Sequence, residues 1–344
     1  MSYDRFKEHL SEMHRKAISI LKLLNEEEQY RLKNFLNKCY PSQEHYWAVK
    51  KLFCHAMYIP MFLIIGRRHF KKLVYIDTHA GPGLAKIGKG DNEIILGSPL
   101  ISIFWPSVIA QKVRRFSGII DGFDELYLIE KDQSIEKLLR NIINAAVGHN
   151  VDKIIPCLGD CNTKLPKIIS ELSAESNGNG NDRILVYLFA DPYGKLESQL
   201  KYNVLKSLTE ELTVDVMMTV MSVNIARGLS KLKGLDRERS MEIIFGENVI
   251  ETLNLKDGAR TISPNHVIQA YKRMMGSIGY KKVKFIPVEF AKGTIYHVML
   301  ATKGKGKWID NYVDYIRNKS PQDYDTLKAL FLQAIGKQSS IEQY

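Results

Sequence analysis

Four acidic residues stand at or near the ends of short apolar runs. Asp77 ends KLVYID, Glu130 ends ELYLIE, Asp160 ends KIIPCLGD, and Asp191 follows RILVYLFA. If these runs are parallel strands of one open sheet, their carboxyl ends meet at the edge where such sheets bind ligands. Carboxylates that converge there repel one another unless a ligand or cations organise them. The pattern therefore predicts a ligand rich in hydrogen-bond donors or positive charge.

An adenosine-bearing ligand has the donors that these acids need. Glu130 would accept hydrogen bonds from the two ribose hydroxyls, and Asp160 from the adenine amino group. The loop after the first acid, THAGPG, contains Gly81 and Gly83, and the absence of a Cβ at these positions lets the backbone approach a ligand closely. The sequence thus predicts adenosine at the carboxyl edge.

The glycine loop disfavours a cofactor that carries a pyrophosphate. Such a cofactor requires G-x-G-x-x-G opening directly into a helix, whose N-terminus holds the phosphates. Here Lys86 stands at the third glycine's position, and the first well-capped helix starts near Ser98. An adenosine ligand without phosphate but with a cationic sulfonium, S-adenosylmethionine, suits the acids better.

The remaining sequence pattern predicts how the acids are positioned. Runs that are apolar on both faces, separated by helix-sized segments, predict a doubly wound α/β core with a mostly parallel sheet. We expect a helical N-terminal region packed on the core in residues 1–70, the core itself in 71–222, a helical insertion or cap in 223–280, and strands and helices completing the core in 281–344. The last part contains two strand-like runs, which predict a late β pair.

Composition indicates the kind of partner. The net charge of +11 favours polyanions, although a solvated basic surface explains it equally well. The longest apolar runs fall short of the roughly 20 residues that span a bilayer, and charges interrupt the N-terminus where a signal peptide is apolar. We expect a cytoplasmic protein without a membrane partner. The four cysteines have no metal-ligand spacing, so we expect reduced thiols and no bound metal.

Four motifs together carry a resemblance to a known family. YIDTHAGPG, GSPL, YLIEKD and FADPYG, in this order over roughly residues 45–310, resemble the three-Cys-motif partner proteins. That family is a branch of the class I S-adenosylmethionine-dependent methyltransferase fold, a Rossmann-like sheet. The resemblance implies that Asp77, Gly81 and Gly83 line the methionine side of the cofactor, Glu130 the ribose and Asp160 the adenine.

The resemblance also implies catalytic residues. DPYG stands where amino-methyltransferases carry an acid or amide, two prolines and an aromatic residue, which makes Asp191, Pro192 and Tyr193 the catalytic candidates. Tyr193 takes the place of the second proline, a departure that leaves the amino-nitrogen target open. His79 stands where the family usually has an aromatic residue. It is either a ring bonded to the backbone of the turn or a base at the cofactor loop.

Basic clusters predict how a nucleic acid would be held. Arg67 with Arg68, Arg114 with Arg115, and Lys303 with Lys305 are the candidate substrate contacts, and aromatic residues adjoin several such clusters. We therefore expect a methyltransferase that modifies a base nitrogen in a nucleic acid, with RNA, and tRNA in particular, favoured over DNA.

Two other functions stay open. One is a non-catalytic protein of this fold that binds nucleic acid or a companion protein, and the other is a methyltransferase for small molecules. Covalent transfer to cytosine C5 is disfavoured, because no cysteine follows Cys161.

Overall fold

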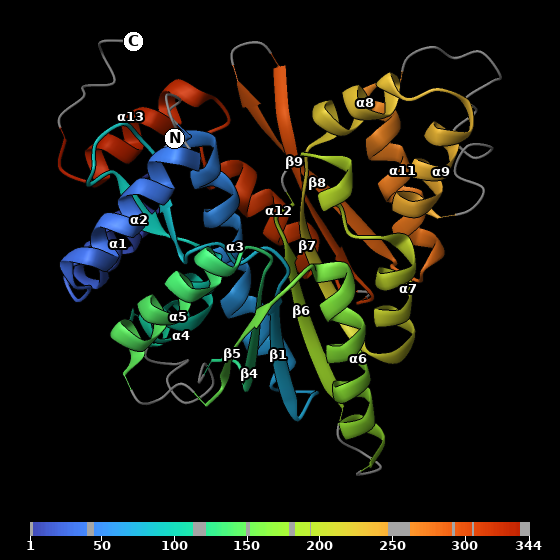
Figure 1. The fold of residues 1–344 in the computed structure, drawn as a ribbon, viewed down its shortest axis with the longest axis horizontal. Coiled ribbons are helices and arrows are strands. Elements are labelled where there is room, and N and C mark those ends of the chain that lie inside the picture. Colours follow the sequence, from blue (N-terminus) through green and yellow to red (C-terminus); the bar gives the residue numbers. More distant parts are fainter. Residues whose placement is uncertain are drawn as a thin grey trace.

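A seven-stranded sheet forms the centre of the protein (Figure 1). The structure is a computed structural model and describes residues 3–39, 45–112, 122–148, 152–178, 183–192, 194–246, 262–290, 293–304 and 306–337. The strands lie in the order β5-β4-β1-β6-β7-β9-β8. Their bounds are β1 (Lys72–Asp77), β4 (Glu125–Glu130), β5 (Ile154–Leu158), β6 (Ile184–Ala190), β7 (Thr213–Val220), β8 (Lys282–Phe290) and β9 (Gly293–Thr302).

The first five strands of this sheet are parallel, and the last two close it with an antiparallel pair. The pairs β5–β4, β4–β1, β1–β6 and β6–β7 are parallel, whereas β9 runs antiparallel to both β7 and β8. The central strand β6 is buried along its whole length, which is why its sequence shows no alternation. The predicted Rossmann-like sheet, mostly parallel with a late antiparallel pair, is confirmed.

Helices cover both faces of the sheet. One hydrophobic cluster unites one face with α1 (Asp4–Leu21), α2 (Glu26–Cys39), α3 (Tyr46–Gly66), α4 (Ser98–Lys112), α5 (Gln133–Val147), α12 (Trp308–Lys319) and α13 (Tyr324–Ala334). A second cluster unites the other face with α6 (Cys161–Gly178), α7 (Tyr202–Glu211), α8 (Ser222–Lys231), α9 (Gly234–Phe245) and α11 (Pro264–Ser277). The N-terminal helices therefore share their core with the sheet.

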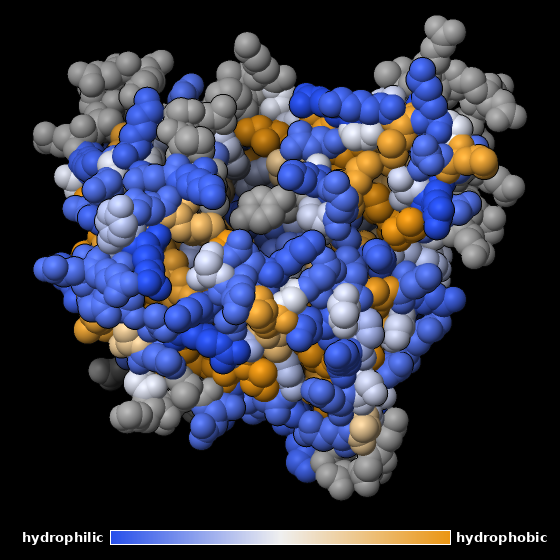
Figure 2. Space-filling view, in the orientation of Figure 1, coloured by the Kyte–Doolittle hydropathy of each residue, from blue (hydrophilic) through white to orange (hydrophobic). Residues whose placement is uncertain are grey.

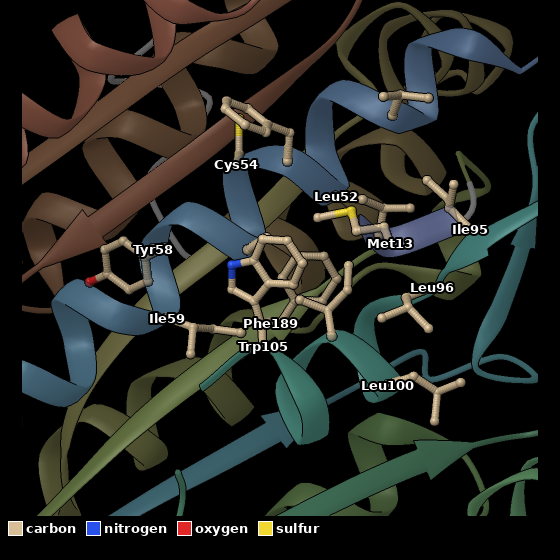
Figure 3. Packing of buried hydrophobic residues seen from close by; sticks show 14 of the residues in the cluster. Met13, Leu52, Cys54, Tyr58, Ile59, Ile95, Leu96, Leu100, Trp105 and Phe189 are labelled. Carbon is tan, nitrogen blue, oxygen red and sulfur yellow. The ribbon is translucent and has the colours of Figure 1, made fainter. Parts of the chain in front are cut away.

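The helix α3 lies within the first of these clusters. Figure 3 labels Leu52 and Ile59 of this helix together with Trp105 of α4 and Phe189 of β6, all members of this cluster. In the described part of the chain, α3 is also the one helix long and apolar enough to cross a bilayer, with a mean hydropathy of 1.5 over an 18-residue window. Since 61% of that window is buried inside the protein, α3 has the surroundings of a core helix.

A short hairpin separates the glycine loop from α4. It consists of β2 (Leu84–Lys86) and β3 (Ile94–Leu96), which form a second, two-stranded sheet. The sequence predicted the delayed start of the helix at Ser98 but not these strands, because three residues are too few to show a period. The loop therefore opens into a hairpin and not into a helix N-terminus.

Candidate functional site at the carboxyl edge of the sheet

The sheet brings the four acids to one edge. Asp77 and Glu130 end β1 and β4, Asp160 lies two residues beyond β5, and Asp191 directly follows β6. Hydrogen bonds between backbone atoms join the loops at this edge: Thr78 N donates to Phe189 O at 3.0 Å, Ala80 N to Ile129 O at 2.9 Å, and Gly159 N to Glu130 O at 2.8 Å. This edge is the upper one in Figure 1, from which α6 runs back along the sheet. The predicted convergence is confirmed.

Asp77 lies beneath the glycine loop and is fully buried. One carboxylate oxygen accepts from the backbone N–H of His79 at 3.1 Å, and the other accepts from the hydroxyl of Tyr75 at 3.1 Å. Burial raises the pKa of Asp77 to about 7, and the negative charge of Asp191 adds to this rise, whereas hydrogen bonds from Ser98, His79 and Tyr75 oppose it. A positive charge placed over the loop would favour the ionised form.

Glu130 holds the glycine loop through backbone donors. Its Oε2 accepts from the N–H of Gly81, and its Oε1 accepts from the N–H of Asp132, both at 2.9 Å. Gly81 has φ +61°, and a Cβ there would meet nothing within 4 Å, so the loop borders open space. Gly83 also has a positive φ, of +83°, but a Cβ there would meet Leu139 and Leu100. The first glycine thus leaves room for a ligand, and the second allows the loop to pack on the helices behind it.

Asp160 begins α6 and is paired with a lysine. Its Oδ1 accepts from Asn162 N at 2.9 Å, and its backbone carbonyl accepts from the N–H groups of Thr163 and Lys164. The Nζ of Lys131 lies 3.4 Å from Oδ2. Asp160 therefore caps α6, and about a third of its side chain, 34%, is still exposed at the carboxyl edge.

Asp191 forms an ion pair with Lys51 of α3. About a fifth of each side chain is exposed, at 21% for Lys51 and 23% for Asp191. Pro192 is buried, and Tyr193 lies outside the described residues. Gly194 packs against α8, because a Cβ there would come within 2.5 Å of the amide nitrogen of Asn224. Asp191 is thus held by α3, and Gly194 lies against α8.

His79 is held by hydrogen bonds on both ring nitrogens. Nδ1 lies 2.8 Å from the hydroxyl of Thr78, and Nε2 lies 3.1 Å from the carbonyl of Ser198. Burial lowers its pKa, so the neutral ring is favoured at neutral pH. Of its two predicted roles, the ring bonded to backbone fits these contacts. It joins the glycine loop to the short 3-10 turn η2 (Leu196–Ser198) beyond the DPYG segment.

The cations of this site were missed in the sequence. Four converging carboxylates needed partners, and the structure supplies Lys51 for Asp191 and Lys131 for Asp160. The signal for Lys51 was present, since it stands within YWAVKKLFCHAMYIP, an otherwise largely apolar helix. Nothing in the sequence indicated which strand end that helix would face.

Three of the predicted substrate contacts, Arg67, Arg68 and Lys303, lie within the described residues and away from this site. Arg67 follows α3 and binds Asp124, just before β4, with its Nη1 and Nη2 at 2.5 and 3.0 Å. Arg68 is exposed on the same turn, and Lys303 follows the antiparallel β9 and donates to the carbonyl of Thr209. All three lie at the amino edge, because they adjoin the starts of the parallel strands, and their contact with a substrate stays a prediction. Arg114, Arg115 and Lys305 lie outside the described residues.

The carboxylates and the open space at the carboxyl edge fit S-adenosylmethionine. Open space borders Gly81, and the carboxylates of Glu130 at the end of β4 and of Asp160 beyond β5 offer acceptors. A cation nearby would favour the ionised form of the buried Asp77. The hairpin after the loop leaves no helix N-terminus for a pyrophosphate at this point. These observations agree with the ligand expected from the sequence.

Comparison with known proteins adds a fold likeness. No family model and no curated protein matches the chain. Among solved structures, a Legionella pneumophila protein of the family model DUF519 aligns at TM-score 0.43 and 15% identity, over 80% of this chain and 92% of that one. An O-methyltransferase from Bacillus cereus in complex with SAH aligns at TM-score 0.35 and 8% identity, over 79% and 97%. A putative O-methyltransferase from Klebsiella pneumoniae aligns at TM-score 0.33 and 12% identity, over 79% and 96%.

These alignments carry no argument about this chain, since each of the three TM-scores is below 0.5. The strand order and the antiparallel β9 are by themselves those of a Rossmann-like sheet of the class I methyltransferase type. The chain therefore has this fold. Membership of the three-Cys-motif partner family stays a prediction.

Proposed function

We propose that this protein is an S-adenosylmethionine-dependent methyltransferase that modifies a nucleic-acid base by direct transfer to a nitrogen. RNA, and tRNA in particular, is favoured over DNA, and the cytoplasm is the expected compartment. The observation that carries the proposal is the carboxyl edge itself. Asp77 and Glu130 hold the glycine loop there, Asp160 follows the neighbouring strand β5, and the paired Asp191 follows β6.

The residues around the loop would hold the cofactor. Glu130 would accept from the ribose, Asp160 from the adenine amino group, and the Gly81 loop would pass beside the methionine part. Asp77 would act from below, by holding the loop and by offering a buried negative charge to a cation. S-adenosylmethionine, when bound, supplies a methyl group on a cationic sulfur.

Asp191 would orient the acceptor. A carboxylate that follows the central strand β6 can accept a hydrogen bond from an N–H of the substrate and take up the proton as the nitrogen is methylated. A cysteine nucleophile is not poised for this reaction among the described residues. Cys161 lies 3.9 Å from His79 Nε2, and burial raises its pKa to about 12, which keeps the thiol protonated. Direct transfer is therefore favoured over a covalent intermediate.

A basic segment beside the same edge supports a polyanionic substrate. Lys231, Lys233 and Arg239 are exposed at the end of α8 and on α9, the helices that follow β7 at its carboxyl end. Figure 2 shows hydrophilic residues over much of this region, with apolar ones between them. Together with the net charge of +11, this segment is better placed for phosphate contacts than the amino-edge arginines.

The proposal is tested by incubating the protein with labelled S-adenosylmethionine and separate pools of tRNA, rRNA and DNA, followed by mass spectrometry of the nucleosides. We expect label in a base of tRNA or rRNA and binding that weakens steeply with salt. Cofactor binding without nucleic-acid binding or transfer would favour a small-molecule methyltransferase. No heat of cofactor binding in calorimetry would favour a non-catalytic protein that binds nucleic acid or a companion protein.

A further inference from the structure

We propose that Lys51 belongs to the acceptor site, where Lys51 and Asp191 together recognise a base edge on which an N–H lies beside a second hydrogen-bond acceptor. This inference rests on the proposed function and specifies its substrate. An edge of this kind is found on the Watson–Crick side of each base, for example the amino group and N1 of adenine, or N1–H and O6 of guanine. The nitrogen bound by Asp191 is the one that is methylated.

The ion pair places a donor next to an acceptor. The ammonium of Lys51 contacts Oδ2 of Asp191 directly, and the two side chains come from α3 and from the end of β6. An ammonium has three N–H donors and no acceptor, whereas an ionised carboxylate only accepts. The pair therefore offers one polar group of each kind within a hydrogen bond of each other.

The position of the pair links it to the reacting centre. Burial is the main cause of the lowered pKa of His79, and the charges of Asp191 and Lys51 both act on it as well. Asp191 likewise acts on the pKa of Asp77. The pair thus lies beside the glycine loop, and about four-fifths of each side chain is shielded from solvent, so that its hydrogen bonds to a substrate would not be weakened by bulk water.

The charges of the pair match the movement of the proton. When Asp191 accepts the N–H proton, negative charge builds up on the neighbouring ring nitrogen or carbonyl oxygen of the base. Lys51, which stays protonated, loses its anionic partner at that moment and can stabilise the new charge. The nitrogen gains a carbon–nitrogen bond as the carbon–sulfur bond of the donor breaks, and S-adenosylhomocysteine leaves. Asp191 then returns the proton to solvent.

Other positions of a nucleotide that could receive a methyl group do not match both members of the pair. The N7 and O6 edge of guanine has two acceptors and no donor, so Asp191 would face a lone pair. A ribose 2′-hydroxyl presents one oxygen, and a base carbon presents no hydrogen-bonding proton. The pair therefore predicts methylation at a Watson–Crick nitrogen, and not at guanine N7, a ribose oxygen or carbon.

A binding experiment tests the role of Lys51 without turnover. AMP, CMP, GMP and UMP are titrated into the protein saturated with S-adenosylhomocysteine, for the wild type, Lys51→Met and Lys51→Arg. We expect Lys51→Met to lower the affinity for the preferred nucleotide by about tenfold or more, and Lys51→Arg to retain most of that affinity. The affinity for S-adenosylhomocysteine should stay within about twofold of the wild type in both variants. Lys72→Met is the matched control, because Lys72 pairs with Glu125 and Glu175 at the amino edge.

An analogue of the nucleotide separates recognition from a structural role. If AMP is preferred, 1-deaza-AMP lacks the atom that Lys51 would bind, and it should bind equally weakly to the wild type and Lys51→Met; 3-deaza-CMP serves in the same way for CMP. If Lys51→Met does not fold, the analogue comparison on the wild type and Lys51→Arg still decides. An analogue that binds as tightly as its parent, or a Lys51→Met variant with undiminished nucleotide affinity, overturns the inference.

The methylated product distinguishes this inference from the proposed function. A product methylated at a Watson–Crick nitrogen supports both. A product methylated at guanine N7, at a ribose oxygen or at carbon overturns the role of the pair and leaves a nucleic-acid methyltransferase. Absence of transfer to every pool, with no nucleotide bound, overturns the proposed function and this inference with it.

Discussion

At the amino edge of the sheet, basic side chains bind acids of neighbouring elements, whereas at the carboxyl edge the acids bind loops. Arg67 holds Asp124 with two hydrogen bonds, and Lys72 lies between Glu125 and Glu175. At the other edge, Glu130 accepts two backbone N–H groups. Asp77 likewise accepts one from His79. The acids described at the first edge serve ion pairs, whereas at the second edge Asp77 and Glu130 hold the glycine loop beside open space, and only Asp160 and Asp191 have lysine partners.

This difference distinguishes charged side chains that stabilise the fold from charged side chains that can bind a ligand. An arginine whose fork is matched to one carboxylate has its hydrogen-bonding directions used within the protein. A carboxylate oxygen that accepts one N–H still has a lone pair for a ligand. Variants of matched residues at the two edges should therefore change different quantities, namely unfolding free energy at the amino edge and ligand affinity or turnover at the carboxyl edge.

The largest contrast is expected between Asp191→Asn and Asp124→Asn. Asp191→Asn should lower methyl transfer by about 10²–10³-fold, because the amide cannot take up the proton, while the affinity for S-adenosylmethionine stays nearly unchanged. Asp124→Asn should lower the unfolding free energy and leave turnover near the wild-type value. Methyl incorporation and denaturant unfolding of both variants measure this contrast. Wild-type turnover in Asp191→Asn would remove Asp191 from the mechanism.

The parallel core of the sheet could be predicted from the sequence because β1, β4, β6 and β7 are buried along most of their length, on both faces. Such strands appear as continuous apolar runs, and the acid that ends each run marks the exposed carboxyl edge. Asp77, Glu130, Asp160 and Asp191 were located in this way. The delayed start of α4 was also predicted, since Ser98 and Pro99 are local signals.

The partners of these acids could not be predicted, because they depend on packing between distant segments. Lys51 lies 140 residues before Asp191, and no local pattern relates the two. The edge at which the arginines lie could not be predicted for a similar reason. Arg67 and Arg68 form a basic cluster in the sequence, but the direction of β1 decides at which edge they lie. A charge pattern indicates a polyanionic partner without indicating where it binds.

The pH dependence of stability should report on the buried acid of the carboxyl edge. Burial raises the pKa of Asp77 from an ordinary value of 3.8 to about 7. Between these values the folded chain keeps a proton that the unfolded chain has lost, so the contribution of Asp77 to stability is greatest below about pH 4 and falls as pH rises toward 7. The slope from this group approaches about 1.4 kcal/mol per pH unit within the window.

Asp77→Asn removes that slope, because its side chain is neutral at every pH. The unfolding free energies of the wild type and the variant, measured in urea from pH 4 to pH 8 without ligand, should diverge up to about pH 7 and run parallel above it. Parallel curves over the whole range would show that Asp77 is ionised in the folded protein despite its burial.

A smaller effect is expected for the acid that holds the glycine loop. Glu130→Gln should weaken S-adenosylmethionine binding by about tenfold, because an amide has one acceptor oxygen and leaves Gly81 or Asp132 without its partner. Calorimetry measures the affinity. Glu125→Gln, at the start of the same strand, is the matched control and should leave the affinity as in the wild type. Equal losses in the two variants would mean that the edge is not the binding site.

The smallest effect is expected at the amino edge, where Arg67→Met should lower the unfolding free energy by about 1–2 kcal/mol. Arg67 donates to Asp124 and to the carbonyl of Gly122, and the same carboxylate of Asp124 accepts from the N–H of Leu73 at 2.7 Å. The loss is moderate because Leu73 still holds Asp124 after the arginine is removed and both charged side chains are partly exposed. Urea unfolding measures this loss, and nucleotide and cofactor titrations of the same variant sharpen the contrast between the edges.

A nucleic acid that bound the wild type and Arg67→Met with the same salt dependence would agree with a structural role for Arg67. If the variant instead lowered the slope of log binding constant against log salt concentration by about one, this edge would contact phosphate.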